Sequence, residues 1–116
     1  MKAKRYLTAG WIGDCNEGWR GIIEPLIKEL AEHDGDIFQI KEKFGGLRFY
    51  YFGGNEDFRK KVDKAEEKSY TICEYCGKPG RLRYGGWIKA LCDEHAAERR
   101  EERLIAEGMD EWKNQP

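Results

Sequence analysis

Apolar residues recur at helical spacing between residues 18 and 34, which predicts an amphipathic helix with one face in the core. Pro25 interrupts the pattern, and because proline lacks a backbone N–H, the helix either begins about one turn before it or bends there. We place this helix from about Gly18 to Asp34. Its apolar stripe consists of Trp19, Ile22, Ile23, Leu26, Ile27 and Leu30.

Two runs of β-branched and aromatic residues follow, with polar positions interleaved. They cover residues 37–43 and 47–52 and are joined through Phe44-Gly45-Gly46, which predicts a β-hairpin. Asn55 is a good N-cap for a helix from Glu56 to about Tyr70. That helix carries a thin apolar stripe of Phe58, Val62, Ala65 and Ser69.

The C-terminal third contains a CxxC pair and a CxxH pair separated by fifteen residues. Their members are Cys73, Cys76, Cys92 and His95. A zinc ion takes about four sulfur and nitrogen donors in a tetrahedron, and two close pairs supply such a set with little strain. We therefore predict a structural Zn²⁺ site with these four residues as ligands.

The residues around the ligands predict a treble-clef finger. Gly77 and Gly80 permit a tight knuckle after the first pair, and Gly85-Gly86 predicts a hairpin between short strands at residues 81–84 and 87–91. Acidic residues directly after Cys92 favour a helix start, which would place Cys92 and His95 on one helical face. This last helix is expected to reach about Glu107 and to stop at Gly108.

Other uses of the cysteines are less consistent with the chain. Met1 to Gly10 is polar and no charged leader with an apolar stretch opens the sequence, so we expect a reducing, cytoplasmic setting without disulfides. A redox CxxC would leave Cys92 and His95 without a role. Cys15 has no partner at ligand spacing and is expected to be a small buried hydrophobe.

The same ligand set argues against catalysis, because four protein donors leave no position for a zinc-bound water. The chain lacks the HxE and PCxxC signature of deaminases and the HExxH of zinc proteases. Nucleases with a similar finger need an additional histidine, and the only other one is His33. We therefore expect a protein that binds and is not an enzyme.

Size and charge limit the remaining classes. The chain has 116 residues, with 21 basic and 22 acidic side chains. Its nearly balanced net charge therefore argues neither for nor against a nucleic-acid partner or any other partner. No apolar run approaches the ~20 residues of a membrane span, so no membrane association is expected. A charge-rich run in the last helix, Glu98 to Arg103, is typical of a solvated face.

A block of residues resembles a known family. The segment Glu17-Gly18-Trp19, the KEKFGGLRFY hairpin beginning at Lys41 and the CxxC and CxxH finger are similar to those of small, uncharacterised proteins of bacteria, phages and prophages. The similarity covers most of residues 15 to 95. The resemblance implies that the protein is located in the cytoplasm of a bacterium or of a phage-infected cell. It does not imply any particular enzymatic reaction.

Two clusters of basic and aromatic residues are candidate binding surfaces. The cluster on the first hairpin consists of Lys41, Lys43, Arg48 and Tyr50. The cluster on the finger consists of Lys78, Arg81, Arg83, Trp87 and Lys89. Such mixtures suit nucleic acid, although strand alternation alone can produce them. Balanced charge and abundant aromatic residues favour a protein partner. The protein would then be, for example, an inhibitor of a host factor or an adaptor that binds one.

Together these patterns predict an α+β protein. We expect a helix and β-hairpin unit over residues 1–54, a connecting helix over 55–72, a treble-clef-like ββα zinc finger over 73–108 and a tail over 109–116. The tail is either mobile or docks back onto the body through Trp112, which could alternatively contact a partner.

Overall fold

The structure is a computed structural model that describes residues 1–100. The predicted continuation of the last helix to Glu107, its stop at Gly108 and the tail with Trp112 lie outside these residues. Within the described part, none of the helices is both long enough and apolar enough to pass through a membrane.

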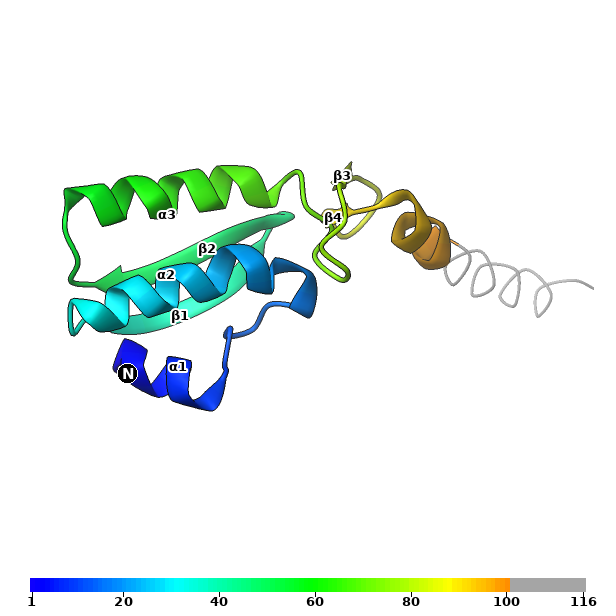
Figure 1. Cartoon of the computed structure of the whole chain (residues 1–116). Coiled ribbons are helices and arrows are strands. Elements are labelled where there is room, and N and C mark those ends of the chain that lie inside the picture. Colours follow the sequence, from blue (N-terminus) through cyan, green and yellow to red (C-terminus); the bar gives the residue numbers. More distant parts are fainter. Residues whose placement is uncertain (101–116) are drawn as a thin grey trace, which may run out of the picture.

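The architecture is α+β, as predicted (Figure 1). Two antiparallel hairpins form separate two-stranded sheets, and a further helix covers residues 93–100. In chain order the other elements are α1 (Ala3–Ala9), the 3-10 turn η1 (Glu17–Trp19), α2 (Arg20–Glu32), β1 (Asp36–Lys43), β2 (Gly46–Phe52), α3 (Glu56–Ser69), β3 (Arg81–Arg83) and β4 (Lys89–Leu91).

Helices α2 and α3 lie side by side over one face of the β1–β2 sheet, and α1 flanks α2. The predicted apolar stripes of both helices point into this core, where Trp19 and Phe58 are fully buried. Asn55 caps α3 as predicted, accepting a hydrogen bond from Phe58 N at 2.9 Å. Pro25 lies inside α2, five residues after its first residue, so the backbone hydrogen bond that this position would donate to Gly21 O is absent.

The β1–β2 hairpin has a two-residue turn. Lys43 pairs with Gly46, and Phe44 and Gly45 between them both have positive φ, 54° and 83°, as in a type I′ turn. The register is irregular between Ile37 and Gln39. This bulge leaves Phe38 on the outer side of the sheet, where it is 60% exposed.

Both edges of this hairpin are covered. On the β1 side, Ile37 N donates to Met1 O at 2.7 Å and Asp14 N donates to Ile40 O at 2.9 Å. On the β2 side, Leu47 N donates to Ser69 Oγ and Phe49 N to Glu66 Oε2, each at 2.9 Å. Strand addition at either edge would have to displace these groups.

Helix α1 was not predicted. It buries only Ala3 and Tyr6, which are too few apolar positions to give a recognisable period. Gly10 ends it in the left-handed conformation with φ of 70°, and Ala3 N donates to Gly35 O at 2.9 Å. The helix is therefore stabilised by tertiary contacts more than by its own sequence.

We call residues 1–70 the body and residues 71–100 the finger. The finger lies at the end of the body where the β1–β2 turn is found (Figure 1). Ala90 belongs to the main core, and Ile72 and Leu82 pack against it. A smaller cluster of Cys73, Leu91 and Cys92 forms the interior of the finger.

Candidate metal centre

The predicted ligands come together as one group. The Sγ atoms of Cys73, Cys76 and Cys92 and a ring nitrogen of His95 all lie within 4.8 Å of one another. The sulfurs of Cys76 and Cys92 are 3.7 Å apart, and His95 Nδ1 is 3.5 Å from the sulfur of Cys73 and 3.3 Å from that of Cys92. The group could hold a metal ion.

These separations can be compared with ideal coordination. A tetrahedral ion at about 2.3 Å from sulfur and about 2.0 Å from nitrogen separates two sulfurs by about 3.8 Å and a sulfur from the nitrogen by about 3.5 Å. The three separations given above differ from these by at most about 0.2 Å, and the whole group lies within 4.8 Å. Three thiols and an imidazole are therefore arranged closely enough for one tetrahedral ion.

The first ligand pair lies in a tight knuckle. Cys73 N donates to Lys78 O at 2.8 Å, and Gly77, with φ of 80°, donates to Cys73 O at 2.9 Å. Burial raises the pKa of Cys73, but backbone N–H groups of Cys92, Cys76 and Tyr75 outweigh that effect and lower the pKa below its usual value. The thiolate, which is the form that binds metals, is thereby favoured.

The second pair lies where β4 passes into the helix that begins at Asp93. His95 presents Nδ1 to the sulfurs, while its Nε2 is 4.0 Å from a carboxylate oxygen of Glu98. The ring of Tyr75 packs edge-on against His95, with 5.4 Å between the ring centroids. The order of knuckle, β3–β4 hairpin and helix start is the one predicted.

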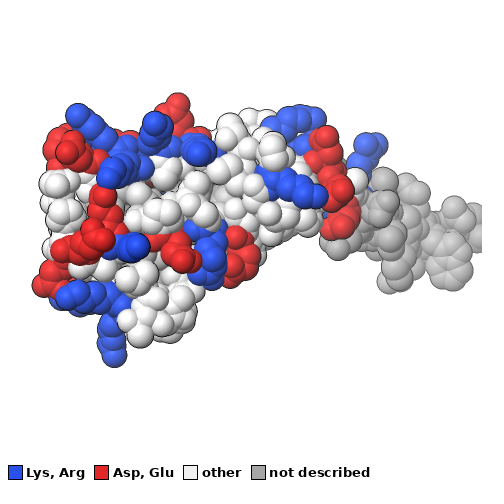
Figure 2. Space-filling view, viewed as in Figure 1, with Lys and Arg blue, Asp and Glu red and all other residues white. Residues whose placement is uncertain are grey.

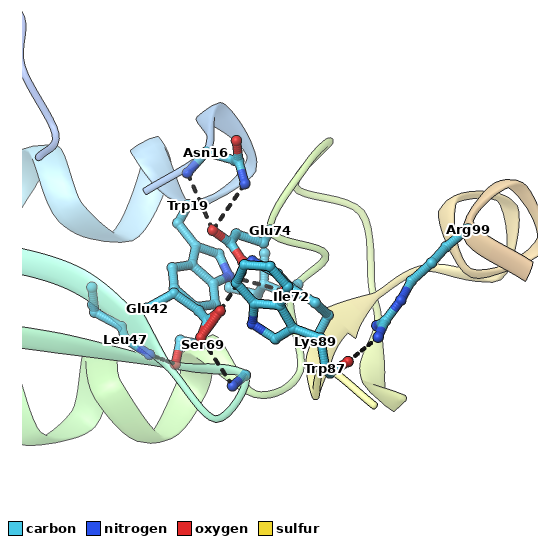
Figure 3. Close-up of polar contacts among 11 residues, drawn as sticks. Asn16, Trp19, Glu42, Leu47, Ser69, Ile72, Glu74, Trp87, Lys89 and Arg99 are labelled. Atoms are coloured by element: carbon cyan, nitrogen blue, oxygen red, sulfur yellow. Dashed lines mark hydrogen bonds and ion pairs between the residues drawn. The ribbon is translucent and has the colours of Figure 1, made fainter. Parts of the chain in front are cut away.

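A buried carboxylate inside the CxxC loop joins the finger to the body. Glu74 is 1% exposed, and its Oε1 lies 3.1 Å from Lys89 Nζ. Its Oε2 accepts from both the backbone N and the side-chain Nδ2 of Asn16, at 3.3 and 3.0 Å. Lys89 reaches on to Glu42 of β1, with 3.0 Å between Nζ and Oε1. Figure 3 shows Glu74 between Asn16 on one side and Lys89 on the other.

This arrangement keeps Lys89 charged. Burial alone would lower its pKa, but the hydrogen bonds to Glu42 and Glu74 outweigh that effect, so the pKa lies above its ordinary value. The expectation that Lys89 contributes a cation to an exposed binding surface is therefore revised, because its side chain is 12% exposed and both contacts are internal. Glu74, Glu42 and Asn16 were not singled out from the sequence.

The Glu17-Gly18-Trp19 segment forms a second contact with the finger. Gly18 N donates to Glu74 O at 2.7 Å, and a Cβ atom at Gly18 would lie only 2.2 Å from Cys73 O. Trp19 Nε1 donates to Ile72 O at 3.0 Å. Glycine is required here because the two backbones approach so closely.

The glycines of the KEKFGGLRFY hairpin form a third contact. A Cβ atom on Gly45 would lie 2.5 Å from a methyl group of Leu82, and one on Gly46 would lie 2.4 Å from the ring of Tyr70. Arg48 donates to the hydroxyl of Tyr70 at 3.2 Å. The Glu17-Gly18-Trp19 segment and the glycines of the first hairpin thus border the place where the finger is attached.

The basic residues of the finger are largely matched by its own carboxylates. Arg83 lies 2.7 Å from Asp93 and lowers the pKa of that carboxyl group, and Lys78 lies 3.7 Å from Glu94. Arg81 is exposed. On the face shown in Figure 2, positive and negative side chains are intermixed over the described residues.

Trp87 is 68% exposed and borders a shallow cleft between the tips of the two hairpins. The other residues lining this cleft are Glu42, Lys43, Phe44, Gly86 and Ile88. The cation of Lys43 lies 5.7 Å from the ring centre of Phe44, and that of Lys89 lies 5.1 Å from Trp87.

The outer side of the β1–β2 sheet carries a second set of predicted surface residues. Ile40 and Phe49 pair across the hairpin and are buried, so the neighbouring pairs Gln39–Tyr50 and Lys41–Arg48 face outward. Phe38 and Phe52 join them, with 4.5 Å between their ring centroids. We call Phe38, Tyr50, Phe52, Lys41 and Arg48 the aromatic face.

Phe38 and Phe52 were not among the predicted surface residues. Counting alternate residues back from the buried Ile40 would place Phe38 on the inner face of the sheet, and the bulge between Ile37 and Gln39 moves it to the outer face. The sequence contains no clear signature of this bulge. Lys41 and Tyr50 were predicted together, and Lys41 Nζ lies 5.9 Å from the ring centre of Tyr50.

Cys15 is partly buried and packs against the main core, in line with the prediction for it. Burial raises its pKa to about 12, and the carboxylates of Glu74 and Asp14 act in the same direction. Its thiol is therefore a poor nucleophile near neutral pH.

Comparisons of the chain with protein-family models, with curated proteins and with solved structures found no match.

Proposed function

We propose that this protein is a non-enzymatic, zinc-stabilised binding module that docks a partner protein on its aromatic face. The observation that carries the proposal is the exposure of Phe38 and Phe52, 60% and 63%, on a sheet face that no other described element covers. Aromatic and arginine side chains in such a position are typical of the energetic centre of protein interfaces.

The proposed ion is Zn²⁺. Three sulfurs and one imidazole form a donor set that suits zinc, and the three ligand-atom separations of 3.3 to 3.7 Å are close to those around a tetrahedral zinc ion. Four protein donors would leave no position for water, so the ion would act structurally. Its effect would be to tie the knuckle of Cys73 and Cys76 to the helix start at Cys92 and His95.

A protein partner is favoured over nucleic acid because several basic side chains of the finger already form ion pairs within the protein. Lys89 and Arg83 are engaged by Glu74 and Asp93, so the finger offers phosphates much less positive charge than its sequence suggests. The resemblance to small bacterial and phage proteins supports a bacterial or phage-infected cytoplasm as the proposed setting. An inhibitor or adaptor that acts on a host or phage factor would fit that setting.

Single-stranded nucleic acid is the second candidate, because Tyr50 lies beside Lys41 and two residues from Arg48 on the same strand. Bases stack on exposed aromatic rings while cations hold the backbone. Binding of this kind weakens steeply as salt rises.

The two candidates are separated by affinity capture from a nuclease-treated lysate of the bacterial host, with the wild-type chain and Phe38→Ser/Phe52→Ser as matched baits. We expect a protein retained by the wild type at a fixed stoichiometry and lost from the double variant. In parallel, fluorescence anisotropy with an oligo(dT) probe at low and physiological salt measures nucleic-acid binding. Tight, salt-sensitive binding to the oligonucleotide without a captured protein would reject the protein-partner proposal.

A further inference from the structure

The aromatic face is the uncovered layer of an otherwise covered hairpin. One side of the β1–β2 sheet packs on α2 and α3, and both strand edges are occupied by the groups bonded to Ile37, Ile40, Leu47 and Phe49. Sheets are stable when each apolar face has a layer against it. An occupant of this site therefore has to lie across the outer face and not along an edge.

The charge on this face selects the chemistry of the occupant. Lys41 and Arg48 pair across the middle of the hairpin, and the adjacent outward pair is Gln39 with Tyr50. The Arg48 guanidinium donates to the Tyr70 hydroxyl and to Leu47 O, and because both groups are uncharged, its positive charge is not neutralised by these contacts. Asp36, opposite Phe52 at the far end, has its carboxylate 3.6 Å from Lys2. The same face of a second copy would bring like charges together, which is unfavourable. An apolar segment with carboxylates is complementary.

The chain itself contains such a segment outside the described residues. Met109, Asp110, Glu111 and Trp112 combine two apolar side chains with two adjacent carboxylates. Residues 101–116 carry five acidic and two basic side chains, against the near balance of the whole chain. Trp112 is a large aromatic side chain of the kind that packs on Phe and Tyr rings.

The covalent tether makes contact feasible. Twelve residues connect Arg100 to Trp112, and an extended chain of that length spans up to about 40 Å. The face begins near the finger, because the β1–β2 turn packs on Leu82 through Gly45, and Phe38 and Phe52 lie about six residues, or ~20 Å, farther along the hairpin. A short tether raises the effective concentration of a segment to about the millimolar range, which favours binding within one chain over binding between chains.

We propose that residues 109–116 dock on the aromatic face of their own chain, with Trp112 against Phe38, Tyr50 and Phe52 and with Asp110 and Glu111 beside Lys41 and Arg48. The segment then competes with any external partner for the same surface. Only this competition rests on the proposed function, since the intramolecular contact stands independently of it.

The contact is tested on the full-length, metal-loaded chain by zero-length carbodiimide cross-linking, which joins a lysine amine to a carboxylate in direct contact. We expect Lys41 to be linked to Asp110 or Glu111. A mixture of ¹⁵N-labelled and unlabelled chains should show these links within one chain. The yield should fall about tenfold in Trp112→Ala and in Phe38→Ser/Phe52→Ser. The matched control is Trp11→Ala, which removes another exposed tryptophan distant from this face in sequence and should leave the yield unchanged.

Absence of the Lys41 link, or a yield that is the same in Trp112→Ala as in the wild type, would overturn the proposal. Links found only between labelled and unlabelled chains would also overturn it, because the occupant would then be a second copy. Partner capture with Trp112→Ala separates this proposal from the proposed function. Stronger capture supports competition by the segment, whereas unchanged capture with no Lys41 link rejects the docked segment and leaves the partner surface intact.

Discussion

The carboxylate of Glu74 and the ammonium of Lys89 meet 3.1 Å apart inside the junction between the finger and the body. Glu74 lies within the CxxC loop, and Lys89 lies on β4, from which it also reaches Glu42 of β1. The CxxC loop that carries two of the metal ligands therefore also carries the carboxylate whose ion pair with Lys89 helps to attach the finger to the body. Folding of the metal centre and docking of the finger are coupled through this pair.

Glu74→Gln should destabilise the protein strongly. The substitution removes a buried carboxylate that accepts from Lys89 and Asn16, and a hydrogen bond to a charged group contributes about 1.5–3 kcal/mol. Lys89 keeps Glu42 as its remaining ion partner. Chemical denaturation of the metal-loaded protein measures the loss. Glu94→Gln is the matched control, because Glu94 pairs with Lys78 on the surface and its removal should change the free energy of unfolding very little. Equal effects of the two substitutions would show that Glu74 is not a junction residue.

Gly18→Ala should disrupt the attachment of the finger, since the new Cβ would lie 2.2 Å from Cys73 O and 2.4 Å from Glu74 O. Both neighbours are backbone atoms and cannot simply rotate away. We expect a clear loss of stability together with weaker metal retention in competition with a chelator. Gly21 is the matched control within α2, where a Cβ meets nothing within 4 Å. Gly21→Ala should stabilise the helix by about 0.5–1 kcal/mol.

Cys15 should resist alkylation in the folded protein. With its pKa raised to about 12, only about one thiol in ten thousand is ionised at pH 8, compared with about one in four for an ordinary cysteine. Iodoacetamide labelling followed by peptide mass spectrometry should show slow modification that accelerates as the pH rises towards 12. Labelling in guanidinium chloride is the control and should be fast. Rapid modification of folded protein at pH 8 would contradict the proposed environment.

Cys92→Ala should unfold the finger and leave much of the body folded. Loss of one ligand opens the metal site, while α2, α3 and the first hairpin have their own core. Hydrogen exchange should show protection lost over residues 71–100 and largely retained in α2 and β1. Native protection of the finger in this variant would be incompatible with a metal-dependent fold. Ala97→Ser, an exposed change in the same helix, serves as the control.

The parts of the structure that could be predicted from the sequence depend on local spacing. The four ligands follow from two short motifs, and α2, α3 and the first hairpin follow from periodicity and turn residues. Asn55 as a helix cap belongs to the same class, because its partner Phe58 is three residues away. In each case the interacting groups are close together in the chain.

The parts that could not be predicted depend on pairings distant in sequence. Lys89 resembled a surface cation until Glu42 and Glu74 were placed beside it, and Asn16 lies 58 residues from Glu74. Helix α1 forms because Ala3 meets Gly35, and Phe38 faces outward because of a bulge. The need for Gly45 and Gly46 in the first hairpin became clear only from the nearness of Leu82 and Tyr70.

The central claim, that three sulfurs and one imidazole hold a single zinc ion, is tested most directly by the metal content of the freshly purified chain. Elemental analysis combined with X-ray absorption at the zinc edge should give one zinc per chain, with three sulfur neighbours and one nitrogen neighbour. Protein that is folded in hydrogen exchange but contains no stoichiometric metal, or zinc with a different donor set, would contradict the account.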